Sequence, residues 1–120
     1  MKKYLLTLFS LGIIIIGCSK KDSGTPNPGG GTTLDCSTVT NKAFSANVNP
    51  IIQSTCAIVS CHAAGSANGP GALTTYTQIF AARTQIRSSV AAGTMPKSGV
   101  LSTAQKNSIL CWVDSGSPNN

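Results

Sequence analysis

The sequence predicts a small all-α domain, because three stretches of it repeat apolar residues with the period of a helix. These stretches lie near residues 41–55, 75–91 and 102–115, and long polar or glycine-rich segments separate them. Val39 and Val100 are too isolated to indicate strands, and the chain contains no internal repeat. We therefore expect three main helices joined by long loops.

The first helical stretch has an apolar face that a proline interrupts. The residues of that face follow helical spacing: Phe44, Val48, Ile51, Ile52 and Thr55. Pro50 has no amide hydrogen and cannot donate to the hydrogen-bond ladder of a helix. Either the helix kinks at this residue, or a shorter helix begins with Asn49 as its cap and Pro50 at its first position.

The two later stretches have apolar faces and recognisable end signals. The second stops near Gly93, a residue type common just after a helix, and its stripe consists of Tyr76, Ile79, Phe80, Ile86 and Val90. The third begins at Ser102, and Gln105 three residues later completes a capping-box pattern. It ends before Gly116, and its apolar side contains Ile109, Leu110 and Val113.

The beginning of the chain predicts export. Lys2 and Lys3 precede an apolar run over residues 4–17, which is shorter than the roughly 20 residues that a membrane-spanning helix needs. The run closes with Gly17-Cys18, and the chain turns polar directly afterwards. This pattern resembles the lipobox of bacterial lipoproteins, which implies cleavage before Cys18 and a diacylglycerol on its thiol. A soluble secretory signal with a stray cysteine is the alternative.

A flexible tether should follow the lipid anchor. Residues 19–33 have no large apolar side chain and are rich in Gly, Pro, Ser and Thr, so they cannot bury enough surface to fold. We expect a signal peptide over 1–17, an anchor and tether over 18–33, and one domain over 34–120. The resemblance places this domain outside the cytoplasm, held to a membrane on its periplasmic side or at the cell surface.

The charge of the domain is mildly basic. From residue 34 onward the chain has five basic and two acidic residues, an excess of three positive charges. The basic residues are Lys42, Arg83, Arg87, Lys97 and Lys106, and the acidic ones are Asp35 and Asp114. These charges are too scattered for a nucleic-acid interface, which needs a clustered stripe. We therefore expect no nucleic-acid partner, whereas a slightly basic face suits an acidic redox protein.

The chain has five cysteines, and lipidation of Cys18 would leave four. Cys36 lies at the start of the domain and Cys111 on the last helix, so a disulfide between them would form where the terminal segments pack together. Closing a loop of this length stabilises a fold by roughly 4 kcal/mol at most. Cys56 and Cys61 then remain as a second pair.

The second pair belongs to the motif CAIVSCH, which contains the only histidine of the chain. Covalent haem attachment needs two thiols that reach one edge of the porphyrin and an imidazole that reaches the iron. Cys56 and Cys61 are five positions apart and point about 140° from each other in a regular helix, so residues 57–60 must form a loop. His62 would then be the first axial ligand.

Met95 is the only methionine outside the signal peptide, and it precedes Pro96 in the segment before the last helix. A histidine followed by a methionine in this order resembles small single-haem, class I-like cytochrome c domains of lipoproteins from Gram-negative bacteria. The matching segments are residues 48–52, Cys56 with Cys61-His62, Leu73 with Tyr76, Met95-Pro96, and residues 101–116 around Trp112. The four-residue spacer between the cysteines is wider than the usual two residues.

The resemblance implies one covalent haem c and single-electron transfer to or from a redox partner protein, without enzymatic activity. Carried over by position, Cys56 and Cys61 form the thioether links, His62 is the proximal ligand and Met95 the distal one. Pro70 could offer its carbonyl to the proximal imidazole, or form a plain turn. Arg83 could pair with a haem propionate, or lie along the edge of the core.

Other chemistry fits the residues less well. A Cys56–Cys61 disulfide would explain both thiols and would leave His62 without a role. A structural zinc site needs four ligands with a second cluster at tetrahedral spacing, and only Cys36 or Cys111 remains to donate. Thiol catalysis would need a second histidine or a buried carboxylate to activate a nucleophile. The alternative function is therefore a haem-free, disulfide-stabilised lipoprotein that acts as a partner-binding module.

Overall fold

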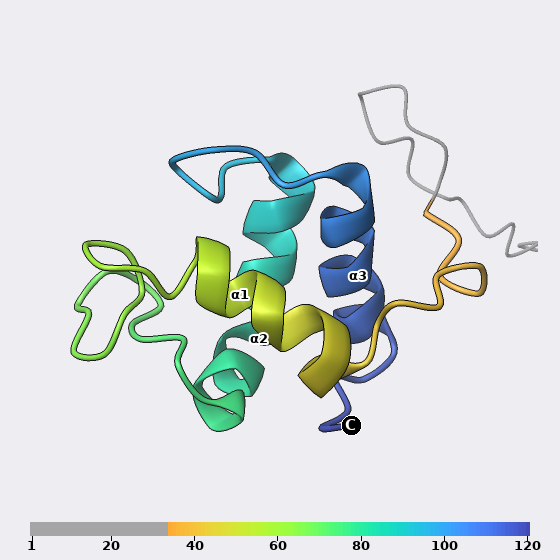
Figure 1. Ribbon diagram of the computed structural model, residues 1–120, viewed down its shortest axis with the longest axis horizontal. Coiled ribbons are helices and arrows are strands. Elements are labelled where there is room, and N and C mark those ends of the chain that lie inside the picture. The colour runs from red at the N-terminus through yellow and green to blue at the C-terminus, as the bar shows by residue number, and fades with distance from the viewer. Residues whose placement is uncertain (1–33) are drawn as a thin grey trace, which may run out of the picture. The chain divides into compact units, whose positions relative to one another are not determined.

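The structure, a computed structural model, describes residues 34–120, so the predicted signal peptide, the lipid anchor Cys18 and the tether lie outside the described residues. The described part contains a π-helical turn η1 (Phe44–Val48) that leads directly into α1 (Asn49–Thr55), then α2 (Tyr76–Ala92) and α3 (Thr103–Asp114) (Figure 1). No strand is present in residues 34–120, which confirms the all-α prediction. Within the same range, no helix has the length and apolar content needed to cross a membrane.

We call η1 and α1 together the first helix. This helix continues through Pro50 and does not begin there. It starts with the wide turn η1, in which the amide of Val48 donates to the carbonyl of Ala43 at 3.1 Å, five residues back. Asn49 likewise donates to Phe44. Because Pro50 has no amide to offer and its ring crowds the carbonyl of the preceding turn, a wider turn before it accommodates the ring. Of the two predicted arrangements, the continuous helix with local distortion is the one observed.

The second and third helices begin and end as local signals dictate. At the start of α2 the side chain of Thr75 accepts a hydrogen bond from the amide of Gln78, and the Gln78 side chain accepts one in return. Gly93 ends α2 with a φ of 69°, the left-handed conformation that glycine adopts without strain. Ser102 and Gln105 form the predicted capping box before α3.

The core lies where the first helix and α3 pack against each other, and α2 packs on α3. Its buried apolar residues are Phe44, Val48, Ile52, Leu73, Ile79, Ala82, Ile86, Val90, Ile109, Leu110 and Trp112. Trp112 has 0% of its surface exposed, and its ring centroid lies 5.4 Å from that of Phe44. The ring of Tyr76 packs edge-on against Phe44 at 4.9 Å. The first helix, α2 and α3 therefore share one aromatic centre.

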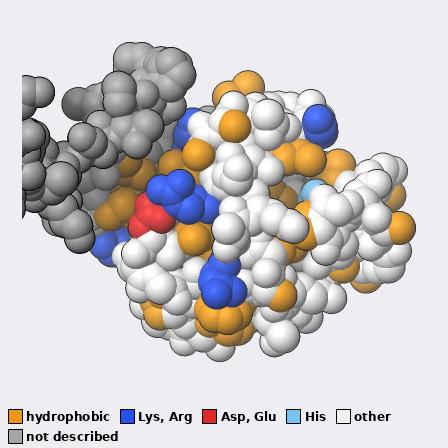
Figure 2. Space-filling view, turned by 180° about the vertical axis from the view of Figure 1, so that it is seen from behind, with side chains coloured by type: hydrophobic (Ala, Val, Ile, Leu, Met, Phe, Trp, Pro, Cys, Tyr) orange, Lys and Arg blue, Asp and Glu red, His pale blue; other side chains and the backbone are white. Residues whose placement is uncertain are grey.

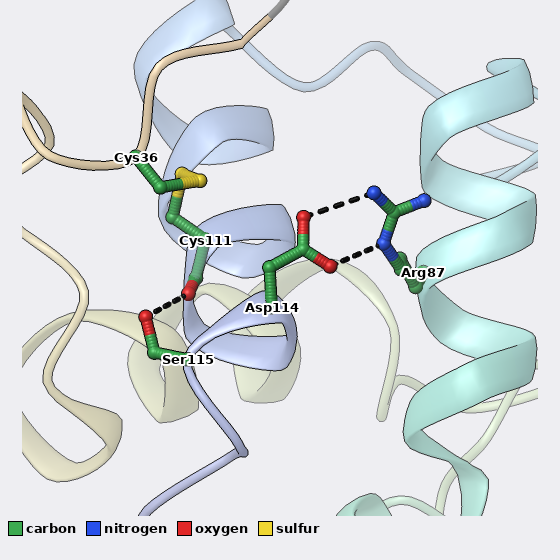
Figure 3. A network of polar contacts seen from close by, with 5 residues as sticks. All are labelled: Cys36, Arg87, Cys111, Asp114 and Ser115. Carbon is green, nitrogen blue, oxygen red and sulfur yellow. Dashed lines mark hydrogen bonds and ion pairs between the residues drawn. A yellow bond between two sulfur atoms is a disulfide. The ribbon is translucent and has the colours of Figure 1, made fainter. Parts of the chain in front are cut away.

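The predicted disulfide between Cys36 and Cys111 is present, with a Cα–Cα distance of 5.3 Å (Figure 3). It fixes the start of the domain to α3. Beside it, the guanidinium of Arg87 on α2 makes two hydrogen bonds to the carboxylate of Asp114 on α3. These bonds raise the pKa of Arg87. Because both side chains are largely exposed, the pair contributes at most about 1 kcal/mol.

The last four residues, 117–120, form a tail that receives hydrogen bonds from the core. The phenol of Tyr76 donates to the carbonyl of Ser117 at 2.8 Å. The indole nitrogen of Trp112 donates to the carbonyl of Pro118 at 2.9 Å. Trp112 is thus buried, and Tyr76 partly buried, without leaving a polar group of either side chain unpaired.

The same tail caps the first helix. The side-chain oxygen of Asn120 accepts a hydrogen bond from the amide of Phe44 at 2.9 Å, and its backbone oxygen accepts one from the amide of Ser45 at 2.7 Å. The first amides of a helix have no partner within the helix, so a distant residue here takes the place of a local N-cap. No side-chain cap is provided by Ala43, the residue before η1.

Candidate functional site

The spacer between Cys56 and Cys61 forms a tight loop, as predicted. Helix α1 ends just before Cys56, and residues 57–60 form turns. The amide of Cys61 donates to the carbonyl of Ile58 at 3.0 Å, and the amide of His62 donates to the carbonyl of Cys56 at 3.0 Å. The second bond closes the loop at its base, so the two cysteines and the histidine are held close along the backbone.

A second layer of hydrogen bonds supports this loop from its far side. The side-chain amide of Asn68 donates to the carbonyls of Ser60 at 3.0 Å and Cys61 at 2.9 Å. The hydroxyl of Ser66 also donates to the carbonyl of Cys61. Ser60 has a φ of 68°, a left-handed conformation that is uncommon for a residue with a side chain. The bonds to its own carbonyl and to the next one hold it there.

Cys56 and Cys61 are free thiols, and both are half-buried. Burial raises the pKa of Cys56, a contact with the hydroxyl of Thr55 at 3.5 Å lowers it, and the negative charge of a Cys61 thiolate raises it. The Cys56–Cys61 disulfide considered above is not formed, and both thiols are free.

Raising the pH should destabilise the protein when Cys56 carries no thioether bond. Because folding raises the pKa of this thiol, the unfolded chain loses its proton first as the pH increases. The stabilisation is therefore complete below the pKa of an unfolded cysteine, about 8.5, and declines above it. Thermal unfolding of haem-free protein at a series of alkaline pH values measures the decline. Cys56→Ala should remove this component, and an equal decline in that variant would contradict the assignment.

His62 is held in one orientation by a hydrogen bond at its ring. Its side chain is 7% exposed, and its Nδ1 atom lies 2.8 Å from the carbonyl oxygen of Gly71. A carbonyl only accepts, so Nδ1 carries the hydrogen and Nε2 of the neutral ring carries a lone pair. Within residues 34–120, Nε2 has no hydrogen-bond partner and is not fully shielded from solvent. This arrangement is typical of a histidine that binds a metal through Nε2.

The carbonyl that orients the ring belongs to Gly71 and not to Pro70, so the predicted acceptor is one residue away from the observed one. The amide of Leu73 donates to the carbonyl of His62 at 2.9 Å, and Leu73 is buried in the core at 3% exposure. Gln53 of α1 donates to the carbonyl of Leu73 at 3.1 Å. The buried position of Leu73 therefore fixes the segment that precedes it. Gly71 lies two residues earlier, so its carbonyl is placed next to the imidazole of His62.

Four residues that build the site were not recognised from the sequence as site residues: Gln53, Ser66, Asn68 and Gly71. Asn68 and Ser66 are residue types that commonly bond nearby backbone in loops, and this is the only local signal they carry. Gly71 has a φ of 100°, consistent with its place after a proline in a turn. Nothing in the sequence around Gln53 distinguishes it from other polar helix residues.

Arg83 contacts Phe80 on its own helix, and Pro70 lies in the loop next to Gly71. Arg83 donates to the carbonyl of Phe80 at 2.7 Å, and its guanidinium carbon lies 4.0 Å from the centre of the Phe80 ring. This corresponds to the predicted arginine at the edge of the core. Pro70 lines an open cavity of about 480 Å³ between the loop and α2, together with Ala72, Gln78, Ala81, Ala82 and Gln85. The cavity borders both neighbours of Gly71.

Met95 lies in the loop between α2 and α3 and is half-buried. Figure 1 shows this loop and the loop that follows α1 extending to the same side of the helices. Figure 2 shows the histidine side chain in a hollow of the surface with hydrophobic side chains around it. Within residues 34–120 no hydrogen bond connects the Met95 loop to His62. Ligation by Met95 therefore stays a prediction.

Residues 34–120 contain no group of three or more His, Cys, Asp and Glu side chains placed to hold a metal ion. A zinc site of the usual composition is thus not formed by these residues. No known protein family, curated protein or solved structure matches the chain. The function is therefore inferred from the site itself.

Proposed function

We propose that this protein is a membrane-tethered electron carrier with one covalently bound haem c. The observation that supports this most strongly is the orientation of His62, whose Nδ1 faces the Gly71 carbonyl while Nε2 keeps its lone pair. Two free thiols precede this ring in the same loop. A simple disulfide loop would not require a histidine fixed in this way.

A haem at this site would give each residue a distinct role. Cys56 and Cys61 would hold the porphyrin through thioether bonds to its vinyl groups. His62 would ligate the iron, and the Gly71 carbonyl would keep its ring oriented and make Nε2 a stronger donor. Met95 would be the second ligand, and a thioether raises the reduction potential. The bound iron would supply a reversible one-electron change.

This proposal carries consequences for partners and location. With His62 and Met95 both bound, the iron would have no position open to a substrate, so we propose a carrier without enzymatic activity. The lipid on Cys18 would hold the carrier to a membrane, outside the cytoplasm. Its electrons would come from and pass to other redox proteins.

One structural feature favours the second candidate, a haem-free, disulfide-stabilised lipoprotein that binds a partner. The Cys36–Cys111 disulfide and the aromatic centre around Trp112 lie at the opposite end of α1 from His62 and do not involve it. Such a fold has stabilising elements that need no cofactor. Under this candidate the thiols of Cys56 and Cys61 would be incidental.

Absorbance separates the two candidates. The full chain is produced in a host that has cytochrome c assembly factors and is then extracted with acidified acetone, which removes haem that is not covalently bound. We expect a Soret band and a sharp α-band in the reduced protein, together with a mass increase of one haem. An unmodified mass and the lack of these bands would support the haem-free alternative.

Replacing Met95 by alanine should open the sixth position of the iron. We expect the reduced Met95→Ala protein to bind carbon monoxide, which shifts the Soret band, and its reduction potential to fall because the thioether is gone. Val100→Ala is the matched control, since this residue lies in the same loop and is 95% exposed. Equal carbon monoxide binding by both variants and the parent protein would remove Met95 from the ligand set.

A further inference from the structure

Asn68 connects the two parts of the candidate site. Its side-chain nitrogen Nδ2 donates to the carbonyls of Ser60 at 3.0 Å and Cys61 at 2.9 Å. Its backbone carbonyl accepts a hydrogen bond from the amide of Gly71, and the carbonyl of Gly71 in turn faces Nδ1 of His62. One asparagine therefore supports the cysteine loop with its side chain, and its backbone begins the turn that carries the acceptor for the imidazole.

Asn68 is followed by Gly69, and this is the only Asn-Gly pair in the chain. Asparagine loses its amide when the backbone nitrogen of the next residue attacks its side-chain carbonyl, and a glycine there has no side chain to hinder the approach. Both residues are exposed, and the amide of Gly69 makes no hydrogen bond within residues 34–120. A Cβ atom added to Gly69 would meet nothing within 4 Å. The nitrogen that would attack is thus unpaired and lies in open space.

We propose that Asn68 is a site of spontaneous deamidation, and that this modification loosens the loop around Cys61 and His62. The nitrogen of Gly69 forms a bond to Cγ of Asn68, the bond from Cγ to Nδ2 breaks, and ammonia leaves with the proton of the Gly69 amide. Water then opens the cyclic imide and leaves aspartate, or isoaspartate in which the backbone runs through the former side chain. Water is the only other reactant, so the modification does not depend on haem or on the proposed function.

Both products remove a donor on which the loop depends. A carboxylate only accepts hydrogen bonds, so its oxygens would oppose the carbonyl oxygens of Ser60 and Cys61 that Nδ2 now contacts. Ser60 would then keep its φ of 68° with less support. Isoaspartate also adds a methylene group to the backbone between Asn68 and Gly71, which displaces the carbonyl that orients His62. The modification therefore acts on the cysteine loop and on the imidazole together.

Incubation of the full, haem-free chain at mildly alkaline pH tests the reaction, because the backbone nitrogen attacks in its deprotonated form. Peptide mass spectrometry, with a methyltransferase that labels isoaspartate, should find conversion at Asn68. Asn107 should keep its amide, because it lies inside α3 where the next backbone amide belongs to the helix. Gly69→Ala fits the open space and should slow the conversion of Asn68 by about tenfold or more. An intact Asn68, or equal rates in Gly69→Ala and the parent protein, would overturn the proposal.

Amide hydrogen exchange of haem-free Asn68→Asp protein tests the effect on the loop. The amides of Cys61 and His62 donate within the loop, and their exchange should become about tenfold faster or more, because two hydrogen bonds that hold it are lost. Exchange in α3 should not change, which shows that the variant is folded. Gly69→Ala keeps the donor and should match the parent protein. Adding Ser60→Gly to Asn68→Asp should restore part of the protection, since glycine adopts a positive φ without strain. Equal exchange in Asn68→Asp and the parent protein would refute the loosening.

Discussion

A variant that combines Cys56→Ala with Cys61→Ala should contain no covalently bound haem. Both thiols are free and half-buried in the same closed loop, and no other free cysteine is present in residues 34–120. Without them, the porphyrin could be held only through ligands to its iron. After extraction with acidified acetone we expect the absorbance of the haem to be lost from the protein, and the mass to equal that of the polypeptide.

The control removes the other pair of cysteines, with Cys36→Ala and Cys111→Ala. This variant should keep its covalent haem and lose about 2–4 kcal/mol of stability, because only the disulfide is removed. Haem that stays bound to the first variant after extraction would show that attachment does not use Cys56 and Cys61. Loss of haem from the control would show instead that the disulfide is required for assembly.

Replacing Trp112 by alanine should lower the free energy of unfolding by about 3–5 kcal/mol. The side chain is 0% exposed and packs against Phe44, and its indole nitrogen donates to the carbonyl of Pro118. The change leaves a cavity among the first helix, α2 and α3, and an unpaired acceptor in the tail. Urea unfolding followed by circular dichroism measures the loss.

Two further variants serve as comparisons for the Trp112→Ala protein. Trp112→Phe keeps an aromatic ring but cannot donate the hydrogen bond, so its loss should be smaller and still measurable. Val100→Ala removes an apolar group that is 95% exposed and should change stability by about 0.5 kcal/mol or less. A Trp112→Ala protein as stable as the Val100→Ala protein would mean that Trp112 does not support the core.

The helix ends that the sequence predicts well are those set by neighbouring residues. Ser102 with Gln105 and Gly93 act through hydrogen bonds and backbone conformation within a few positions, so they can be read without knowing the fold. Thr75 with Gln78 offers the same capping signal and could have fixed the start of α2 to the residue. Pro50 left two arrangements open, because the choice between them depends on how Phe44 and Val48 pack against α3.

The site divides in a similar way. The loop between Cys56 and Cys61 follows from the geometry of a helix, which cannot bring positions five apart to one side. The acceptor for His62 depends on the register of a different segment, which the burial of Leu73 determines. The role of Asn120 at the start of the first helix involves residues more than seventy positions apart, as the Phe44–Asn120 hydrogen bond shows. No local pattern marks such a contact.

The disulfide also determines the mechanical path through the domain. A pull on the chain that precedes Cys36 passes through the sulfur–sulfur bond to Cys111 on α3, and does not travel along the backbone between them. Residues 37–110, which include the whole loop from Cys56 to Gly71 and the Met95 segment, therefore carry no load while the bond is intact. If the chain before Cys36 tethers the domain to a membrane, as proposed, a pull on that tether should leave the geometry around His62 undisturbed.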